Sequence, residues 1–160
     1  MLRLGLIIAV AVVLLDQLTK AVMLDLLPET GTGVTVTGFF NLVHVRNSGV
    51  SFGLLQSDST LGPWLLSGFA LVVSAVLAVW LARADTRLLA CALGLTIGGA
   101  VGNIIDRLRF GAVFDFLDFH AFGWHWPAFN VADSAISIGV AGLLLTSLIG
   151  TRQGTKLDES

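Results

Sequence analysis

Charged side chains are scarce in this chain, and their scarcity excludes most soluble folds. Only 12% of the 160 residues are Asp, Glu, Lys or Arg, whereas a soluble domain carries about 25%. Hydrophobic residues make up 55%, and the mean hydropathy is +0.87. The sequence therefore predicts an integral membrane protein. The net charge of −2 and the lack of a basic patch argue against a nucleic-acid partner.

Metal-ligating residues are also few. The single cysteine, Cys91, cannot form an intrachain disulfide. His44, His120 and His125 are scattered through polar segments and lack the HExxH spacing of a membrane metalloprotease. No spacing typical of a zinc or iron–sulfur site is present. We therefore expect neither a metal nor another cofactor.

Apolar runs divide the chain. A helix of about 20 apolar residues crosses a bilayer, and four segments are about that long: 4–27, 62–82, 88–106 and 131–150. We expect a single integral membrane domain over residues 1–160. Gly94, Gly98 and Gly102 recur every fourth residue in the third segment. They share one helix face, where another helix can approach closely.

The polar segments complete the predicted fold. Outer connections at 28–61 and 107–130 join the spans, and a polar tail at 151–160 is expected to be disordered. Alternation at 34–37 and 42–46 predicts short strands. We therefore predict an all-α membrane protein with four transmembrane helices. A small extracytoplasmic β-rich connection should lie between the first two helices, resting on the membrane surface.

Basic residues favour one orientation. Five lie in the two termini and in the short turn at 83–87, whereas three lie in the two longer connections. Because cytoplasmic segments carry an excess of Lys and Arg, both termini are predicted to be cytoplasmic. The longer connections would then face outward.

Ionisable residues inside apolar segments are costly and suggest function. Asp16 and Lys20 are four residues apart on the first span, so an internal ion pair is the simple alternative. Asp106 lies at the C-terminal end of its helix, where the macrodipole disfavours an anion. Arg107 is one candidate to compensate it, as a structural Asp–Arg pair. Asn103 shares the helical face of Asp106.

The second half of the chain carries further carboxylates. Asn130 and Asp133 fit a capping box at the start of the fourth span, and capping alone would explain both. Asp115 lies on a short extended run with no local basic partner. If Asp115 and Asp133 met at low dielectric, one would keep a proton while the other acted as a base. Asp118 is a competing candidate, interpreted as an exposed loop carboxylate.

Four polar motifs, taken together, resemble those of bacterial lipoprotein signal peptidases, also called signal peptidase II. They follow one another in this order along the chain: Asp16-Gln17-Leu18-Thr19-Lys20, Asn47-Ser48-Gly49-Val50-Ser51-Phe52, Gly98-Gly99-Ala100-Val101-Gly102-Asn103-Ile104-Ile105-Asp106-Arg107, and Val113-Phe114-Asp115-Phe116 with Phe129-Asn130-Val131-Ala132-Asp133-Ser134.

The resemblance implies an aspartyl endopeptidase of the bacterial inner membrane whose catalytic pair is Asp115 and Asp133. It implies that prolipoproteins bearing diacylglyceryl on the lipobox cysteine are cut just before that cysteine, on the extracytoplasmic side. The supporting residues would line the site, support it from the first helix or orient their neighbours: Asn47, Asn103, Arg107 and Asn130; Asp16 and Lys20; and Asp106. Membrane lipids are the other expected partner of a monomeric enzyme.

Two other classes fit parts of the pattern. Asp16, Lys20 and Asp106 could relay protons in a small carrier or channel. The glycine face could instead bind a partner helix in a membrane complex. The polar groups gather on one side of the membrane rather than running across it, which favours the protease.

Overall fold

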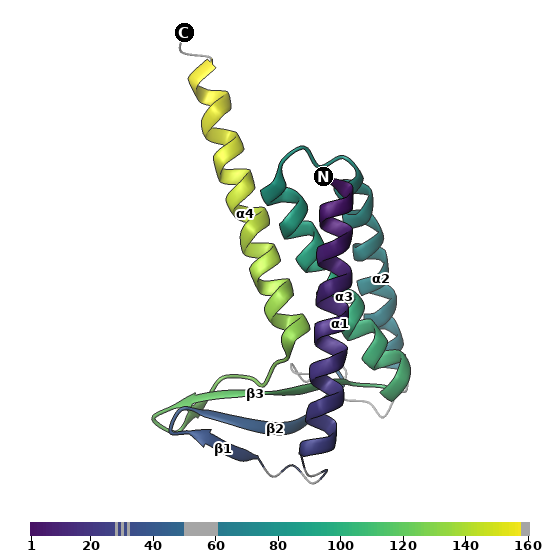
Figure 1. Cartoon of the computed structure of the whole chain (residues 1–160), viewed down its shortest axis with the longest axis vertical. Helices are drawn as coiled ribbons and strands as arrows, with labels where there is room; N and C mark the ends of the chain where they lie inside the picture. The colour runs from purple at the N-terminus through teal and green to yellow at the C-terminus, as the bar shows by residue number, and fades with distance from the viewer. Residues whose placement is uncertain (28, 30, 32, 50–60, 158–160) are drawn as a thin grey trace.

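Four long helices form the body of the protein. The computed structural model describes residues 1–157 except 28, 30, 32 and 50–60, with backbone only at 61 and 149–157. The helices are α1 (Leu2–Leu26), α2 (Leu61–Ala82), α3 (Arg87–Phe110) and α4 (Val131–Leu157). Each is long and apolar enough to cross a membrane, as the sequence predicts. Figure 1 shows them side by side, with a small sheet at one end of the bundle.

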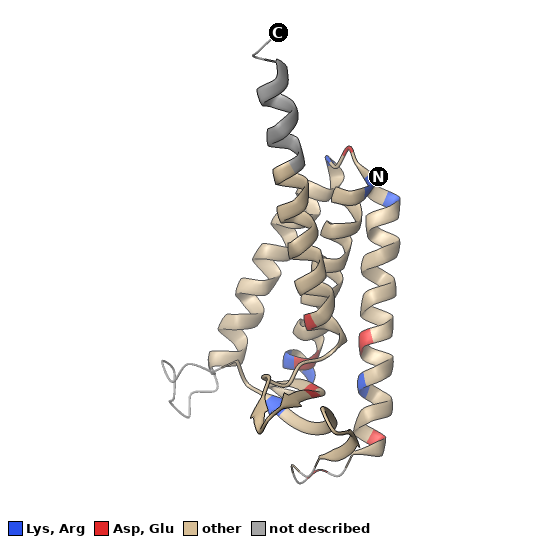
Figure 2. Ribbon diagram, turned by 90° about the vertical axis from the view of Figure 1, so that its left-hand side faces the viewer, with Lys and Arg blue, Asp and Glu red and all other residues tan. Residues whose placement is uncertain are grey.

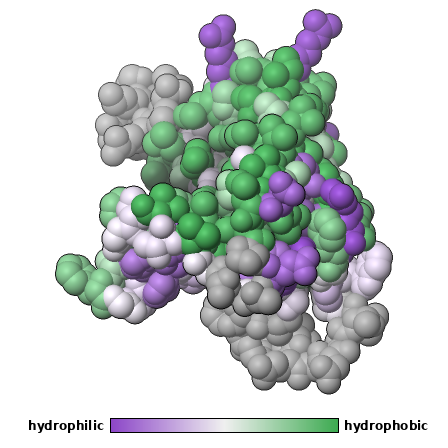
Figure 3. Space-filling model, turned by 60° about the horizontal axis from the view of Figure 1, so that its bottom comes forward, coloured by the Kyte–Doolittle hydropathy of each residue, from purple (hydrophilic) through white to green (hydrophobic). Residues whose placement is uncertain are grey.

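The outer faces of the helices are apolar. Leu65 and Phe69 of α2, for example, are 66% and 71% exposed, which would be costly in water but suits lipid. Figure 3 shows this apolar surface over the helices, with hydrophilic atoms gathered toward the sheet and at the far end. Figure 2 shows that the charged residues likewise lie in the half of the bundle nearer the sheet and at the opposite end. The protein is a multi-pass membrane protein.

The helix α3 lies at the centre of the bundle and packs against the other three. Its glycines permit this packing, as predicted. A Cβ added at Gly98 would lie 2.7 Å from the backbone oxygen of Ala9, and one added at Gly102 would lie 2.6 Å from Asp16 Oδ2. The helix ends where Gly111 takes a left-handed φ of 73°, a conformation that glycine adopts without strain.

The sheet draws its strands from both connections. It contains β1 (Val34–Thr37), β2 (Phe40–Asn47), β3 (Val113–Ala121) and β4 (Trp124–His125), antiparallel in chain order. The prediction of a β-rich connection between the first two helices is therefore incomplete. Strand β3, between α3 and α4, pairs with β2 along most of the length of β2 and brings the two connections together.

The N-terminus and the described end of α4 lie away from the sheet. The N-terminus and the C-terminal end of α4 are at the same end of the bundle (Figure 1). The helix α4 continues beyond the predicted span of 131–150 as far as Leu157, so it takes in most of the tail that was expected to be disordered. Residues 158–160 of that tail, and residues 50–52 of the second motif, lie outside the described residues.

Candidate active site

The first turn of α4 holds Asp133 in place. The predicted capping box is confirmed, since Asp133 N–H donates to Asn130 Oδ1 (3.0 Å) and Asn130 N–H donates to Asp133 Oδ2 (3.2 Å). The other carboxylate oxygen of Asp133 accepts a bond of 2.8 Å from Asn103 Nδ2 on α3. Asp133 is half-buried, so water can reach it. Capping is therefore only part of its environment.

Strand pairing positions Asp115. A bulge shifts the β2–β3 register between Leu42 and Val45, and beyond it Asn47 lies opposite Val113. Val113 and Asp115 share a face of β3, because alternate residues of a strand point to the same side. Asn47, which is paired with Val113, therefore points to the same side of the sheet as Asp115. Asn47 Nδ2 donates to Asp115 Oδ2 over 3.0 Å, and Asn130 Nδ2 donates to Asp115 Oδ1 over 2.7 Å.

Two asparagines connect the carboxylates. Asn130 Nδ2 donates to Asn103 Oδ1 over 3.3 Å. Asn130 also contacts Asp115, and Asn103 contacts Asp133. Asn130 is fully buried. The structure thus joins two aspartates from β3 and α4 through one pair of amides, and places Asn47 beside them.

Both aspartates border open cavities. One of about 510 Å³ is lined by Asp133, by the next turn of α4 and by residues 126–129. Another of about 310 Å³ is lined by Asp115 and by residues 45–48. The two cavities share Asn47, Pro127 and Ala128. The two cavities therefore adjoin between Asp115 and Asp133.

The surroundings of Asp115 favour its protonated form. Its side chain is 1% exposed. Burial, reinforced by the negative charge of Asp133, raises the pKa of Asp115 to about 7, against the opposing effect of hydrogen bonds from Asn47 and Asn130. At neutral pH this carboxyl can therefore hold a proton that an exposed aspartate would have lost.

A buried charge cluster lies behind the two asparagines. Lys20 Nζ is 2.9 Å from both Asp16 and Asp106, and it donates to Asn103 Oδ1 over 3.3 Å. The ion pair within α1 is confirmed, but it extends to α3. The direct ion pair of Asp106 is with Lys20 rather than with the suggested partner Arg107, whose charge acts on Asp106 only at longer range. Asp106 also accepts a bond of 3.0 Å from Phe114 N–H and so fixes the start of β3.

The cluster also reaches α4. Asp16 Oδ1 accepts a bond of 3.0 Å from Ala132 N–H, which places a carboxylate at the positive end of the α4 dipole. Gln17 was given no role from the sequence, yet its amide donates to Asp106 Oδ1 (3.0 Å) and to Gly102 carbonyl oxygen (3.3 Å). Its position directly after Asp16, within the first motif, is the signal that could have identified it.

Arg107 lies at the edge of the same group. Its Nη1 donates to Asn103 carbonyl oxygen over 3.4 Å, and its positive charge acts on Asp133 and Asp115. Its buried Nε has no partner within the described part of the chain.

Comparison with known proteins places this arrangement in a family. The sequence profile of the family described as Signal peptidase (SPase) II matches residues 8–149. The chain belongs to the signal peptidase II family. It is 50% identical over 153 residues to a lipoprotein signal peptidase of Methylobacterium sp. (strain 4-46), covering 94% of this chain and 92% of the relative. A relative with the same name from Azoarcus sp. (strain BH72) is 50% identical over 141 residues, covering 88% and 79%.

A solved structure agrees with this assignment. A bacterial membrane enzyme superposes with a TM-score of 0.77 at 32% identity, covering 92% of this chain and 88% of the other. Signal peptidase II membership makes the protein a membrane protease. The carrier and the structural subunit are therefore not supported as its principal activity.

One further carboxylate of this signal peptidase II chain, Asp118, lies away from Asp115 and Asp133. Asp118 is not an exposed loop residue: it is 6% exposed on β3 and bonded to Asn41 and His125, each at 2.9 Å. Burial acts to raise the pKa of Asp118, but these two bonds outweigh it and hold the pKa below its ordinary value. Asp118 thus stabilises the sheet. Among the residues described, no three His, Cys, Asp or Glu side chains are placed to hold a metal ion.

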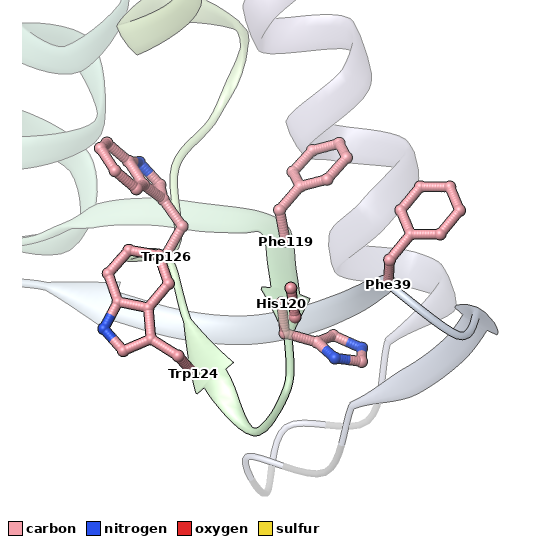
Figure 4. Close-up of a pocket in the computed structure, with 6 residues that line it drawn as sticks. Phe39, Phe119, His120, Trp124 and Trp126 are labelled. Atoms are coloured by element: carbon pink, nitrogen blue, oxygen red, sulfur yellow. The ribbon is translucent and has the colours of Figure 1, made fainter.

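The far end of the sheet is aromatic. A cavity of about 270 Å³ there is lined by Phe39, Phe119, His120, Ala121, Trp124 and Trp126. Figure 4 shows Phe39, Phe119 and Trp126 pointing to the side from which the helices rise. Phe122 is fully exposed, with a φ of 52° followed by 79° at Gly123, as a two-residue hairpin turn of the I′ type requires.

Proposed function

We propose that this protein removes the signal peptide from diacylglyceryl-modified prolipoproteins, cutting just before the lipidated lipobox cysteine, with Asp115 and Asp133 activating a water molecule. The supporting observation is the joining of these two carboxylates by Asn103 and Asn130 beside two adjoining cavities. Relatives named lipoprotein signal peptidase, about half identical to this chain, support the choice of substrate.

The two carboxyls have complementary tasks in this proposal. Asp133, which is half-buried, takes a proton from water as the water oxygen attacks the scissile carbonyl carbon. Asp115, protonated, gives its proton to the carbonyl oxygen. When the tetrahedral intermediate collapses, Asp133 returns its proton to the leaving nitrogen and Asp115 takes one back from a hydroxyl. The C–N bond breaks without a covalent enzyme adduct.

The neighbouring polar groups hold this geometry. Asn47, Asn103 and Asn130 keep the two carboxylates in place, and the positive charge of Arg107, which acts on Asp133 and Asp115, stabilises the developing charge on oxygen. Fixed donors at low dielectric stabilise such a charge more than mobile water does. Lys20, Asp16 and Asp106 support the asparagines from behind.

The membrane brings the substrate to the site. A signal helix lying in the bilayer along α4 would reach the cavity that contains Asp133, Ser134 and Ser137. Two acyl chains would hold the scissile bond near the interface and raise its local concentration. In this arrangement the single-domain monomer lies in the bacterial inner membrane with both termini cytoplasmic. The site faces outward, and the aromatic end of the sheet rests on lipid.

Cleavage of a purified substrate tests the proposal. The protein, in liposomes, is incubated with a diacylglyceryl-modified prolipoprotein and, separately, with the same precursor lacking the lipid. We expect mass spectrometry to show loss of the signal peptide from the lipidated precursor, with the cysteine as the new first residue. If folded protein cleaves neither precursor, or cuts elsewhere, the proposal is wrong. Proton flux across the same liposomes would then test the carrier alternative.

A further inference from the structure

Two arginines share one aromatic ring at the sheet end of α3. The guanidinium carbon of Arg46, on β2, lies 5.1 Å from the ring centroid of Phe110. That of Arg109, on α3, lies 4.9 Å from the same centroid. Arg46 also lies 5.5 Å from the ring of Phe114. Cation–π attraction holds each guanidinium against Phe110, so two positive charges are anchored on one ring.

No protein anion neutralises this pair within the described residues. Neither guanidinium is within ion-pair distance of a carboxylate in that part of the chain. Asp106 and Asp115, on the adjoining segments, are buried and bonded to other partners. Arg46 Nε donates to His44 (3.2 Å), which leaves its outer nitrogens free. Both arginines are exposed, so an external anion can reach them.

The surroundings indicate what kind of anion fits. Phe110 is the last residue of α3 and is 44% exposed, and Leu108 beside it is 54% exposed. These two exposed apolar side chains flank Arg109 in the sequence. A ligand bound here would therefore contact charge at one end and hydrocarbon at the other. Guanidinium groups pair with phosphate through two parallel hydrogen bonds.

We infer that Arg46, Arg109 and Phe110 form a binding site for the phosphate headgroup of an anionic phospholipid in the leaflet next to the sheet. The two guanidinium groups hold the phosphate, Phe110 keeps them in place, and the acyl chains lie along Leu108 and the outer face of α3. The positive-inside pattern predicts few basic residues in the outward-facing connections. A lipid-binding role would explain why Arg46 and Arg109 are found there.

The lipid would also act on catalysis, a consequence that rests on the proposed protease function. Arg46 directly precedes Asn47, which donates to Asp115, and both residues line the cavity beside Asp115. A phosphate bound by Arg46 restrains the end of β2 and hence this hydrogen bond. Anionic lipid should therefore raise kcat more than it lowers KM.

Native mass spectrometry of the purified protein tests the binding itself. Protein in detergent is titrated with phosphatidylglycerol or with phosphatidylcholine of the same acyl chains. The site variant is Arg46→Gln/Arg109→Gln. The matched control, Arg83→Gln/Arg87→Gln, removes two exposed arginines at the other end of the bundle. A basic side chain near an anionic surface contributes a factor of about five in affinity, so the site variant should lose roughly tenfold or more in phosphatidylglycerol affinity, and the control little.

Three results of these titrations would each overturn the inference: equal retention of both lipids by the wild-type protein, unchanged phosphatidylglycerol retention by the site variant, and an equal loss in the control. A fourth comes from a lysine variant. An Arg46→Lys/Arg109→Lys variant keeps the charge but not the planar fork, and we expect it to bind less tightly than wild type. If it binds equally well, the attraction is diffuse surface charge rather than a built site. Because this readout is binding, it is independent of whether the protein cleaves prolipoproteins.

Discussion

Replacing Lys20 with methionine should lower both the free energy of unfolding and the rate of turnover. Lys20 is 3% exposed and lies 2.9 Å from two carboxylates, those of Asp16 and Asp106, which are also almost fully buried. Methionine fills similar space but leaves both anions without their cation. Removing one partner of a buried ion pair costs about 3–5 kcal/mol, and we expect a loss of that size in the free energy of unfolding.

The effect on rate follows from one hydrogen bond. Lys20 donates to Asn103 Oδ1, and the amide nitrogen of Asn103 donates to Asp133. Without Lys20 this amide loses the contact that fixes its orientation. Because small misplacements of catalytic groups are costly, turnover of folded Lys20→Met protein should fall on the order of tenfold to a hundredfold.

A double-mutant cycle in detergent measures the coupling. Unfolding is followed for Lys20→Met, Asp106→Asn and the double variant, with Arg3→Met at the exposed start of α1 as the control. The double variant has one orphan anion fewer, so it should be more stable than the sum of the single losses by about 1 kcal/mol or more. If Lys20→Met unfolds like wild type, or the losses simply add, the buried cluster does not support the site as described.

Three further outcomes are expected. Because the pKa of Asp115 is raised to about 7 and its protonated form is needed, kcat/KM should fall about tenfold per pH unit above that value; a flat profile to pH 9 would contradict this role. Gly102→Ala should cost about 1–3 kcal/mol in unfolding free energy, since its Cβ would press on Asp16, and an unchanged melting temperature would contradict the close packing. With the other tryptophans replaced by phenylalanine, Trp124 and Trp126 should be quenched by lipids brominated near the headgroup, whereas aqueous iodide alone quenching them would show that the sheet stands clear of the bilayer.

Local patterns were sufficient to predict the helices. Hydropathy and length identify all four, because a lipid-facing helix needs apolar residues around most of its surface. Glycine spacing identified the packing face of α3, and the Asn130–Asp133 spacing identified a capping box that the hydrogen bonds confirm. Each of these features depends on residues within a turn or two of one another.

Contacts between distant segments were harder to predict. Asp118 seemed exposed because its partners, Asn41 and His125, come from other strands. Asp106 seemed to need its neighbour Arg107, whereas Lys20 of another helix neutralises it. The motifs suggested which residues belong to the site, but not the amide link between Asn103 and Asn130. Such pairings depend on how helices and strands pack together, which spacing along the chain does not encode.

Cleavage by matched aspartate variants tests the two-aspartate mechanism most directly. Wild type, Asp115→Asn, Asp133→Asn and Asp118→Asn are each shown to be folded and are then incubated with the lipidated prolipoprotein. Asp118 is the control, since it is another buried carboxylate on the same strand as Asp115. We expect Asp118→Asn to cleave and the other two variants to lose on the order of a thousandfold or more in rate. Cleavage by Asp133→Asn at the wild-type rate would contradict the mechanism and leave Asp133 as a helix cap.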